Sequence, residues 1–385
     1  MRIVIYNSSS FGGCFDYGRE LLDAYSRNPK VSSCSWWIPV NADSEKTERI
    51  RKILLNDKPA VENRILRQLH FLFRSVFNPM LLFLRLAATR DSLVILNDFE
   101  QLTAFLWVPL FKRVLGRRHR FAIILHDPDR DAYPPNLAWT NYSMNLIMGL
   151  TDFAFYHDSL PEKSYYKTGT SCVYLDLPHG IFRMPEPDPE CLALIHKMNA
   201  NHLKIMAIPG NIREEKNYDI AIRSLVSLPD FALLIAGAPA NARVDSDRYR
   251  SLASDCGVAD RVFWLERYLS AGELSAVVAG ADVIVLNYAD SFTSQSGILN
   301  VAAPFKKVLV VSDGPSSLAA VVRKFSIGTI VKDSTPGALA TAMVQSLENP
   351  ESKKAAWESY LAFASWDRHV EMAIECILSN QPQLK

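Results

Sequence analysis

Short apolar runs alternate with longer stretches of helical periodicity along the chain. In the first half, the runs typical of buried strands are Ile3–Tyr6, Ser35–Pro39, Leu93–Leu96, Phe121–Leu125, Phe153–Tyr156 and Cys172–Leu175. Between them, apolar residues recur at helical spacing in Tyr17–Arg27, Ser44–Leu55, Val61–Ala88, Gln101–Leu115 and Leu137–Gly149. This alternation predicts βαβ units and a parallel sheet.

A segment with alternate prolines follows, from Phe182 to Pro189. Proline donates no backbone hydrogen bond and favours extended backbone, so we expect a linker over residues 183–200. The strand pattern then restarts at Lys204–Ile208, Ala232–Ala236, Val262–Leu265, Val283–Leu286, Val308–Val311 and Gly328–Val331. Helical patterns separate these runs too, for example Tyr218–Leu225, Ala271–Ala279 and Pro336–Leu347.

The predicted fold is therefore α/β, with two Rossmann-like doubly wound domains over residues 1–182 and 201–364. Ligands of such sheets bind at the carboxyl ends of the strands. We expect the two domains to face a central cleft, and the residues that follow each strand to form its site.

Composition limits the classes of function. The chain has 385 residues, and its 42 Lys and Arg balance 41 Asp and Glu, which excludes a general polyanion binder but not a local basic patch. The six cysteines form no CxxC pair, so neither a zinc site nor a disulfide framework is expected, and a reducing compartment is favoured. The N-terminus lacks the apolar core of a signal peptide. The most apolar stretch, His70–Ala88, is interrupted by Arg74, by Asn78-Pro79 and by Arg85, so we expect no clean membrane-spanning helix and a cytoplasmic protein.

Three loops of the first half carry candidate chemistry. After the first strand, Gly12 and Gly13 precede a helix, where backbone N–H groups favour an anion; a plain βα turn is the alternative. After the strand Phe121–Leu125, His126 is a candidate to orient a substrate or contact a sugar hydroxyl, and Asp127 is a candidate acceptor-side or hinge residue. Two overlapping DxD patterns in Asp127–Asp131 have turn capping as the alternative to a metal site, and we assign no metal ligands. His179 is either a substrate contact or a structural hinge residue.

In the second half, one loop combines glycine with basic side chains. Gly210 and Asn211 are followed by Arg213 and Lys216, a forked donor and a point charge suited to a diphosphate. A solvated loop whose two glutamates balance the two bases is the alternative.

Two further loops fit an anion site. Gly237 ends the second strand of this half, and hydroxyl and amide groups stand before a helix at Ser294, Gln295, Ser296 and Gly297. Simple capping is the alternative for the serines.

Taken in order, these motifs resemble those of a GT-B fold glycosyltransferase of the retaining family 4 type, in its "QSG" subgroup. The segments that carry the resemblance are Gly12-Gly13, His126–Pro128, Pro178–Gly180, Gly210–Lys216, Leu233–Gly237, Ala281–Tyr288, Gln295–Gly297 and Lys307–Asp313.

The resemblance implies hexose transfer, with retention, from a nucleotide-diphosphate sugar to a glycan or lipid-linked acceptor, as in polysaccharide or surface glycan synthesis. It implies a donor on the second domain, an acceptor on the first, and a C-terminal helix over 365–385 that returns to the first domain. Arg213 and Lys216 would stabilise the departing diphosphate, and His126 would contact the transferred sugar. No metal or other cofactor is implied.

Three positions depart from the family pattern. Many relatives carry glutamates, seven residues apart, where this chain has Ser294 and Val301, and many carry arginine at Asn211. The alternative is therefore a catalytically silent GT-B subunit that binds a nucleotide or glycan and supports a partner transferase.

Residues 49–120 form a basic region, with 14 Lys and Arg against five acidic residues and a net charge of +9. Interleaved Leu, Phe and Trp favour peripheral contact with an anionic membrane. A packed helix pair with a solvated basic face is the alternative. We expect no nucleic-acid partner, because no binding motif accompanies the charge.

Overall fold

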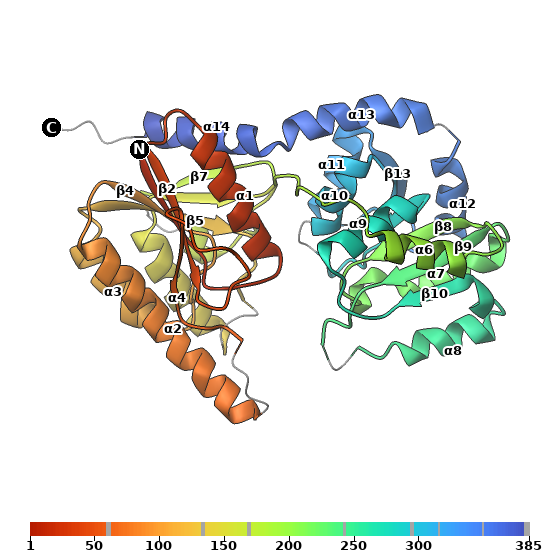
Figure 1. Ribbon diagram of the computed structural model, residues 1–385, viewed down its shortest axis with the longest axis horizontal. Helices are drawn as coiled ribbons and strands as arrows, with labels where there is room; N and C mark the ends of the chain where they lie inside the picture. The colour runs from red at the N-terminus through yellow and green to blue at the C-terminus, as the bar shows by residue number, and fades with distance from the viewer. Residues whose placement is uncertain are drawn as a thin grey trace. The chain divides into compact units, whose positions relative to one another are not determined.

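The computed structural model describes residues 1–58, 63–131, 135–167, 171–241, 244–292, 296–314, 316–348 and 350–380, without the side chains of 64, 167 and 350–355. The chain divides into two compact units (Figure 1). Unit 1 comprises Met1–Gly180 with Ser365–Lys385, and unit 2 comprises Ile181–Ala364.

Unit 1 is built on a parallel sheet of seven strands in the order β3-β2-β1-β4-β5-β6-β7. The strands are β1 (Arg2–Tyr6), β2 (Ser33–Pro39), β3 (Ile50–Leu54), β4 (Ser92–Leu96), β5 (His119–Leu125), β6 (Phe153–Tyr156) and β7 (Val173–Asp176). The helices are α1 (Gly13–Arg27), α2 (Arg64–Ala87), α3 (Ala104–Val114), α4 (Leu137–Leu150), α5 (Ser164–Lys167) and α14 (Trp366–Ser379). Strand order reverses between β1 and β4, the place where doubly wound sheets bind ligands.

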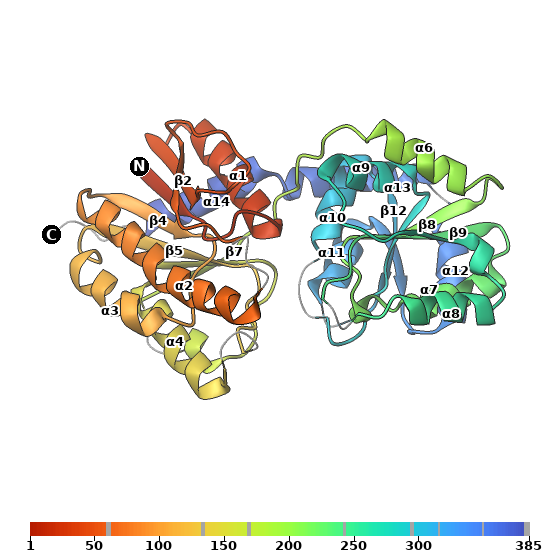
Figure 2. The same cartoon turned by 60° about the horizontal axis from the view of Figure 1, so that its bottom comes forward.

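Helices cover both faces of this sheet (Figure 2). Leu82 of α2, Phe111 of α3 and Met144 of α4 are buried in one core cluster with residues of β4 and β5. Helices α1 and α14 contact each other on the opposite face. Burial of these apolar faces is what holds the layers together.

The prediction of a helix over Ser44–Leu55 is wrong, because residues 50–54 form strand β3. Its backbone pairs with β2, with Ile50 opposite Trp36 and Lys52 opposite Ile38. A five-residue run is too short for periodicity to separate helix from strand, and pairing with the free edge of β2 decides the outcome.

Helix α2 runs unbroken through Pro79, as the helical pattern over Val61–Ala88 predicts. Proline cannot donate to the carbonyl four residues earlier, which belongs to Ser75. The Thr103 hydroxyl donates to that oxygen instead, at 2.6 Å. By length and composition, Ile65–Ala87 could cross a membrane.

Unit 2 has a parallel sheet of six strands in the order β10-β9-β8-β11-β12-β13. The strands are β8 (Lys204–Pro209), β9 (Phe231–Ala236), β10 (Val262–Leu265), β11 (Val283–Leu286), β12 (Val308–Ser312) and β13 (Gly328–Val331). The α-helices are α6 (Pro189–Met198), α7 (Tyr218–Ser224), α8 (Asp247–Asp255), α9 (Ala271–Gly280), α10 (Gly297–Ala302), α11 (Ser317–Phe325), α12 (Pro336–Ser346) and α13 (Pro350–Phe363). Here the strand order reverses between β8 and β11.

The segment 183–200, expected as a linker, lies within unit 2 and contains helix α6. Pro189 stands at the first turn, where its missing N–H costs nothing, and Asp188 caps the helix by accepting from the Cys191 N–H at 2.7 Å. Ile195 is fully buried in the same cluster as residues of α9. The last proline of the run therefore starts a helix.

Candidate functional site

In unit 1, the side chain of Asn97 organises the carboxyl ends of β1, β4 and β5. Its amide nitrogen donates to Asn7 Oδ1 at 2.5 Å and to the Cys14 carbonyl at 2.6 Å. Its oxygen therefore faces His126 Nε2, at 3.0 Å, and that ring nitrogen must carry the proton.

His126 is neutral in this setting. Burial, and then the neighbouring His179, lower its pKa to about 3. With Nε2 donating to Asn97, Nδ1 is left as an acceptor. His126 can therefore accept a hydrogen bond from a hydroxyl group, and its ring carries no charge at neutral pH.

A cavity of about 290 Å³ opens beside His126, within unit 1. Ionisable residues from the ends of β4 and β5 and from α2 line it: Arg74, Asp98, Glu100, Asp127 and Arg130. The structure thus brings the predicted His126 and Asp127 together with four ionisable groups that were not predicted. Asp98 and Glu100 follow the predicted strand Leu93–Leu96, so the rule applied to the other strands would have found them.

The carboxylate of Asp98 occupies part of the loop offered to an anion. It accepts from the backbone N–H groups of Ser8 at 2.5 Å and Ser9 at 3.0 Å, and Asp57 accepts from the Ser10 N–H at 2.7 Å. Burial raises the pKa of Asp98. Of this loop, the glycines keep open space: a Cβ added at Gly12 or Gly13 would meet nothing within 4 Å.

Glu100 is a protonated acid at neutral pH. It is buried and accepts a hydrogen bond from the Tyr6 hydroxyl at 2.6 Å. Burial raises its pKa to about 8. The cavity therefore contains a neutral carboxyl group that is able to donate a hydrogen bond.

His179 belongs to a structural contact between β7 and α14. Its Nδ1 donates to the Gly180 carbonyl at 2.9 Å, and His369 Nδ1 donates to the Pro178 carbonyl at 2.9 Å. An added Cβ at Gly180 would lie 2.1 Å from the Trp366 ring. These contacts favour the structural reading of the Pro178–Gly180 motif.

Four histidines surround the buried ring of Tyr17. The ring centroids of His126, His157, His179 and His369 lie 4.5 to 5.9 Å from that of Tyr17. Burial lowers the pKa of all four, to about 4 for His179 and His369. His157 and His369 were not predicted, because nothing in their neighbouring sequence marks them.

The DxD carboxylates of Asp129 and Asp131 bind Lys163, whose Nζ lies 3.0 and 2.5 Å from their oxygens. They form an ion-paired turn. Among the residues that the structure describes, no group of three or more His, Cys, Asp or Glu could hold a metal ion.

Two glycines bring backbones into contact in unit 2. Gly210 follows β8 with a φ of 84°, and Gly237 follows β9 with a φ of 152°. A Cβ at Gly237 would lie 2.3 Å from the Gly210 carbonyl oxygen. Only glycine fits at position 237, where the two loops touch, and Gly210 stands at the reversal point between β8 and β11.

Lys216 lies buried beneath the Gly210 loop, with 6% of its surface exposed. Its Nζ donates to the Pro209 carbonyl at 2.6 Å, and no carboxylate of the described residues pairs with it. Burial, and then the charge of Arg213, lower its pKa to about 7. A buried, uncompensated amine is costly unless an anion arrives to neutralise it.

The remaining predicted donor residues are placed in part. Arg213 and Asn211 are exposed beside this loop. Ser296 is buried, with its hydroxyl 2.9 Å from that of Tyr288, and Gly297 begins α10 with open space at its Cβ position. Ser294 and Gln295 lie outside the described residues.

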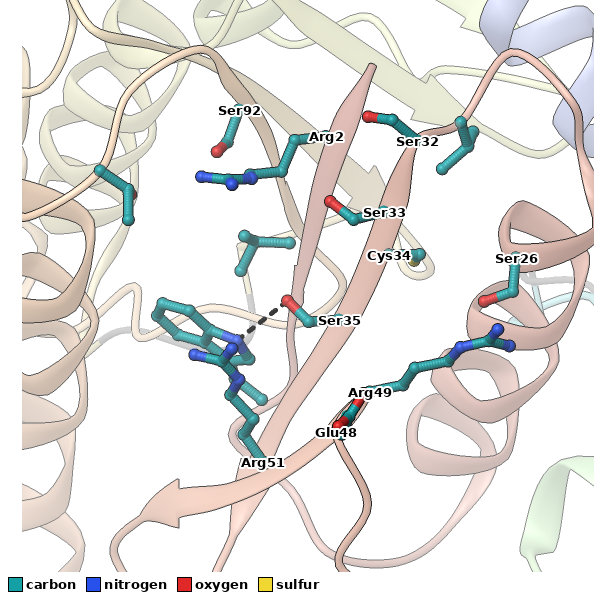
Figure 3. A pocket seen from close by; sticks show the side chains of 14 residues that line it. Arg2, Ser26, Ser32, Ser33, Cys34, Ser35, Glu48, Arg49, Arg51 and Ser92 are labelled. Atoms are coloured by element: carbon teal, nitrogen blue, oxygen red, sulfur yellow. Dashed lines mark hydrogen bonds between the residues drawn. The ribbon is translucent and has the colours of Figure 1, made fainter.

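A third location was not predicted and lies at the opposite end of the unit 1 sheet. A cavity of about 450 Å³ is lined there by the amino ends of β1, β2 and β4 (Figure 3). Arg2 extends toward Ser92 and Arg49 toward Ser26, so these guanidinium groups do not converge on one point.

Comparisons with known proteins agree with this architecture. The family model of glycosyl transferases group 1 matches residues 196–360. D-inositol 3-phosphate glycosyltransferase of Mycolicibacterium vanbaalenii is 29% identical over 180 residues, which are 44% of this chain and 39% of that protein. The match thus spans about two fifths of the relative's length.

Two solved structures share the fold over the full chain. Sucrose-phosphate synthase of Thermosynechococcus elongatus has a TM-score of 0.68 at 14% identity, covering 99% of this chain and 100% of its own. HepE of Anabaena, in complex with UDP-glucose, has a TM-score of 0.66 at 14% identity with the same coverage. The chain therefore has the GT-B fold, and its residues 196–360 match the family model of glycosyl transferases group 1.

Proposed function

We propose that this protein is a retaining glycosyltransferase that moves a hexose from a nucleotide-diphosphate sugar to a glycan or lipid-linked acceptor. The observation that carries the proposal is the buried Lys216 amine, which lies beneath the Gly210 loop and has no carboxylate partner among the described residues. It lies inside the group 1 region and at the reversal point of the unit 2 sheet. We also assign the chain to the "QSG" subgroup, on its Gln295–Gly297 motif.

In this mechanism the donor's diphosphate is held by unit 2. Gly210 and Gly237 allow the phosphates to approach the backbone, and Ser296 and Gly297 add donors at the start of α10. Arg213 and Lys216 place positive charge where negative charge develops as the sugar–phosphate bond breaks. The proposal needs no metal ion, because these groups supply the compensating charge.

Unit 1 would receive the acceptor. The neutral His126 accepts a hydrogen bond from a sugar hydroxyl, while Asp127 and Arg130 line the cavity around it. The UDP-glucose bound by HepE supports a donor of the same chemical class. We place the reaction in the cytoplasm, at the inner face of a membrane that carries the acceptor, in polysaccharide or surface glycan synthesis.

A panel of nucleotide sugars tests the binding half of this proposal by thermal shift. We expect one donor class to raise the melting temperature, and EDTA to leave that increase unchanged. NMR of the glycosylated product should show the same anomeric configuration as the donor. An inverted anomeric configuration would refute the retaining mechanism. Stabilisation that EDTA abolishes would refute the proposal that no metal ion is needed.

A catalytically silent subunit is the second candidate, and one observation favours it. Val301, at a position where many relatives carry a glutamate, is 8% exposed and packs in the core cluster of unit 2. Valine supplies no carboxylate at that position. A nucleotide sugar that binds but never turns over with any acceptor would support this candidate over the transferase.

A further inference from the structure

We propose that helix α2 docks unit 1 on an anionic lipid surface, with the helix lying in the plane of the interface. This inference rests on the proposed function and deepens it, because it commits the acceptor to the lipid-linked class.

The apolar stripe of α2 faces away from the protein. Its members recur at intervals of three, four and seven residues, and between 45% and 66% of each is exposed: Ile65, Leu66, Leu69, Phe73, Phe77 and Leu84. In a soluble domain a stripe with this spacing packs against the core. Here it is the part of the helix with the most exposed apolar surface.

A different face holds α2 to unit 1. Ser75, Asn78, Leu82 and Leu86 are buried, at spacings of three and four residues. Asn78 Oδ1 accepts from the Leu55 N–H at 2.9 Å. A helix fastened along one side cannot cross a bilayer, although Ile65–Ala87 is long enough, so it must lie within the interface.

The neighbouring helices extend the exposed apolar surface. Figures 1 and 2 both show α2 beside α3, and α3 contacts α4. Phe105 and Leu106 of α3, and Leu137 and Tyr142 of α4, are 39% to 57% exposed. A surface of this kind marks an interaction site more often than chance exposure.

The charge of these helices favours an anionic lipid surface as the binding partner. Helices α2, α3 and α4 contain no Asp or Glu, whereas Arg67 and Arg85 of α2 and Lys112 and Arg113 of α3 are exposed. Each basic residue near an anionic leaflet contributes about 1 kcal/mol to binding. A second copy of the same face would bring like charges together, so self-association is disfavoured.

The same helix lines the cavity of unit 1. Phe71, Arg74 and Ser75 of α2 form part of its wall, together with His126. A lipid surface against α2 therefore lies next to the cavity. An amphiphilic acceptor would keep its chain in the leaflet while its polar head entered the cavity.

Co-sedimentation with vesicles tests the proposal, using phosphatidylcholine alone and phosphatidylcholine mixed with phosphatidylglycerol. The wild-type chain should bind the mixed vesicles, and less well as salt rises. The double variant L69E/F73E should bind at least about tenfold more weakly, since it removes buried apolar area and adds repulsion. The matched control V226E/V344E adds the same charge at positions 60% and 49% exposed in unit 2, and should bind like wild type.

Absence of binding by the wild-type chain, or equal loss in the control, would overturn the proposal. So would a change from oligomer to monomer in L69E/F73E, which would make the stripe a contact between copies. A second assay, the release of nucleoside diphosphate from the donor without vesicles, distinguishes failure of the docking proposal from failure of the proposed function. It should persist in L69E/F73E, and its absence from the wild-type chain would refute transfer while leaving vesicle binding as evidence for docking.

Discussion

Lys216 is a buried amine that an anion bound at the Gly210 loop would hold in its charged form. Replacing it by methionine keeps the volume and removes a costly buried charge, so stability should not fall. Turnover should fall by a factor of about 100 in K216M and in R213A, as for other preorganised charges. The control K332M removes an exposed lysine of the same unit. Near-normal rates in both variants would show that neither residue acts on the diphosphate.

The pKa of Lys216 links donor binding to pH. Because it is lowered to about 7, the free amine is largely uncharged at pH 8, and a bound diphosphate would restore its proton. Affinity for a nucleoside diphosphate should therefore fall by up to about tenfold per pH unit above pH 7. Calorimetry in two buffers of different ionisation enthalpy should show proton uptake at pH 8. Uptake that persists in K216M would assign the proton to another group.

At the scale of elements, the sequence predicts those strands and helices that are buried on both faces and contain a long apolar run. Strands β8 to β13 match their apolar runs closely, because parallel strands covered on both faces need continuous apolar sequence. The prediction missed strand β3 because an edge strand is only partly buried, so its sequence shows no continuous apolar run. Helix α6 was missed because Pro189 reads equally as a breaker and as a first-turn residue.

The site was predictable to the same extent. His126, Asp127, Gly210 and Gly237 follow strands directly, and Lys216 stands in the loop after β8. The structure gathers them into one cluster in each unit. His157 and His369 were unpredictable, since their proximity depends on how β6 and α14 pack around Tyr17.

Gly180 joins the last helix to unit 1, which gives a stability prediction. In G180A the new methyl group would meet the Trp366 ring at 2.1 Å, so α14 must shift. We expect a loss of about 1–3 kcal/mol in the free energy of unfolding, measured by urea denaturation. The control G149A lies in α4, where the nearest atom is a flexible Lys112 Nζ at 3.6 Å. An equal effect in both variants would contradict the Gly180–Trp366 contact.

At the scale of the whole molecule, the four histidines around Tyr17 make unit 1 sensitive to acid. All four have pKa values below the ordinary 6.5, so on acidification the unfolded chain binds their protons first. Stability is therefore present above pH 6.5 and is lost as pH falls from there toward 4. Glu100, with a pKa of about 8, and Asp98, whose pKa burial also raises, oppose this trend.

Calorimetric scans between pH 7.5 and about 5 should show this difference between the units. The transition of unit 1 should move to lower temperature, while that of unit 2, whose His196 and His202 are exposed, should move less. Equal shifts in both transitions would contradict the assignment to the Tyr17 cluster.

The most direct measurement is release of nucleoside diphosphate from a panel of nucleotide sugars, by the wild-type chain and by K216M, with EDTA present. We predict steady release from one donor class by the wild-type chain, faster with an acceptor, and about 100-fold slower release by K216M. Donor binding without release by the wild-type chain, with every acceptor offered, would contradict the transferase and identify a silent binding subunit.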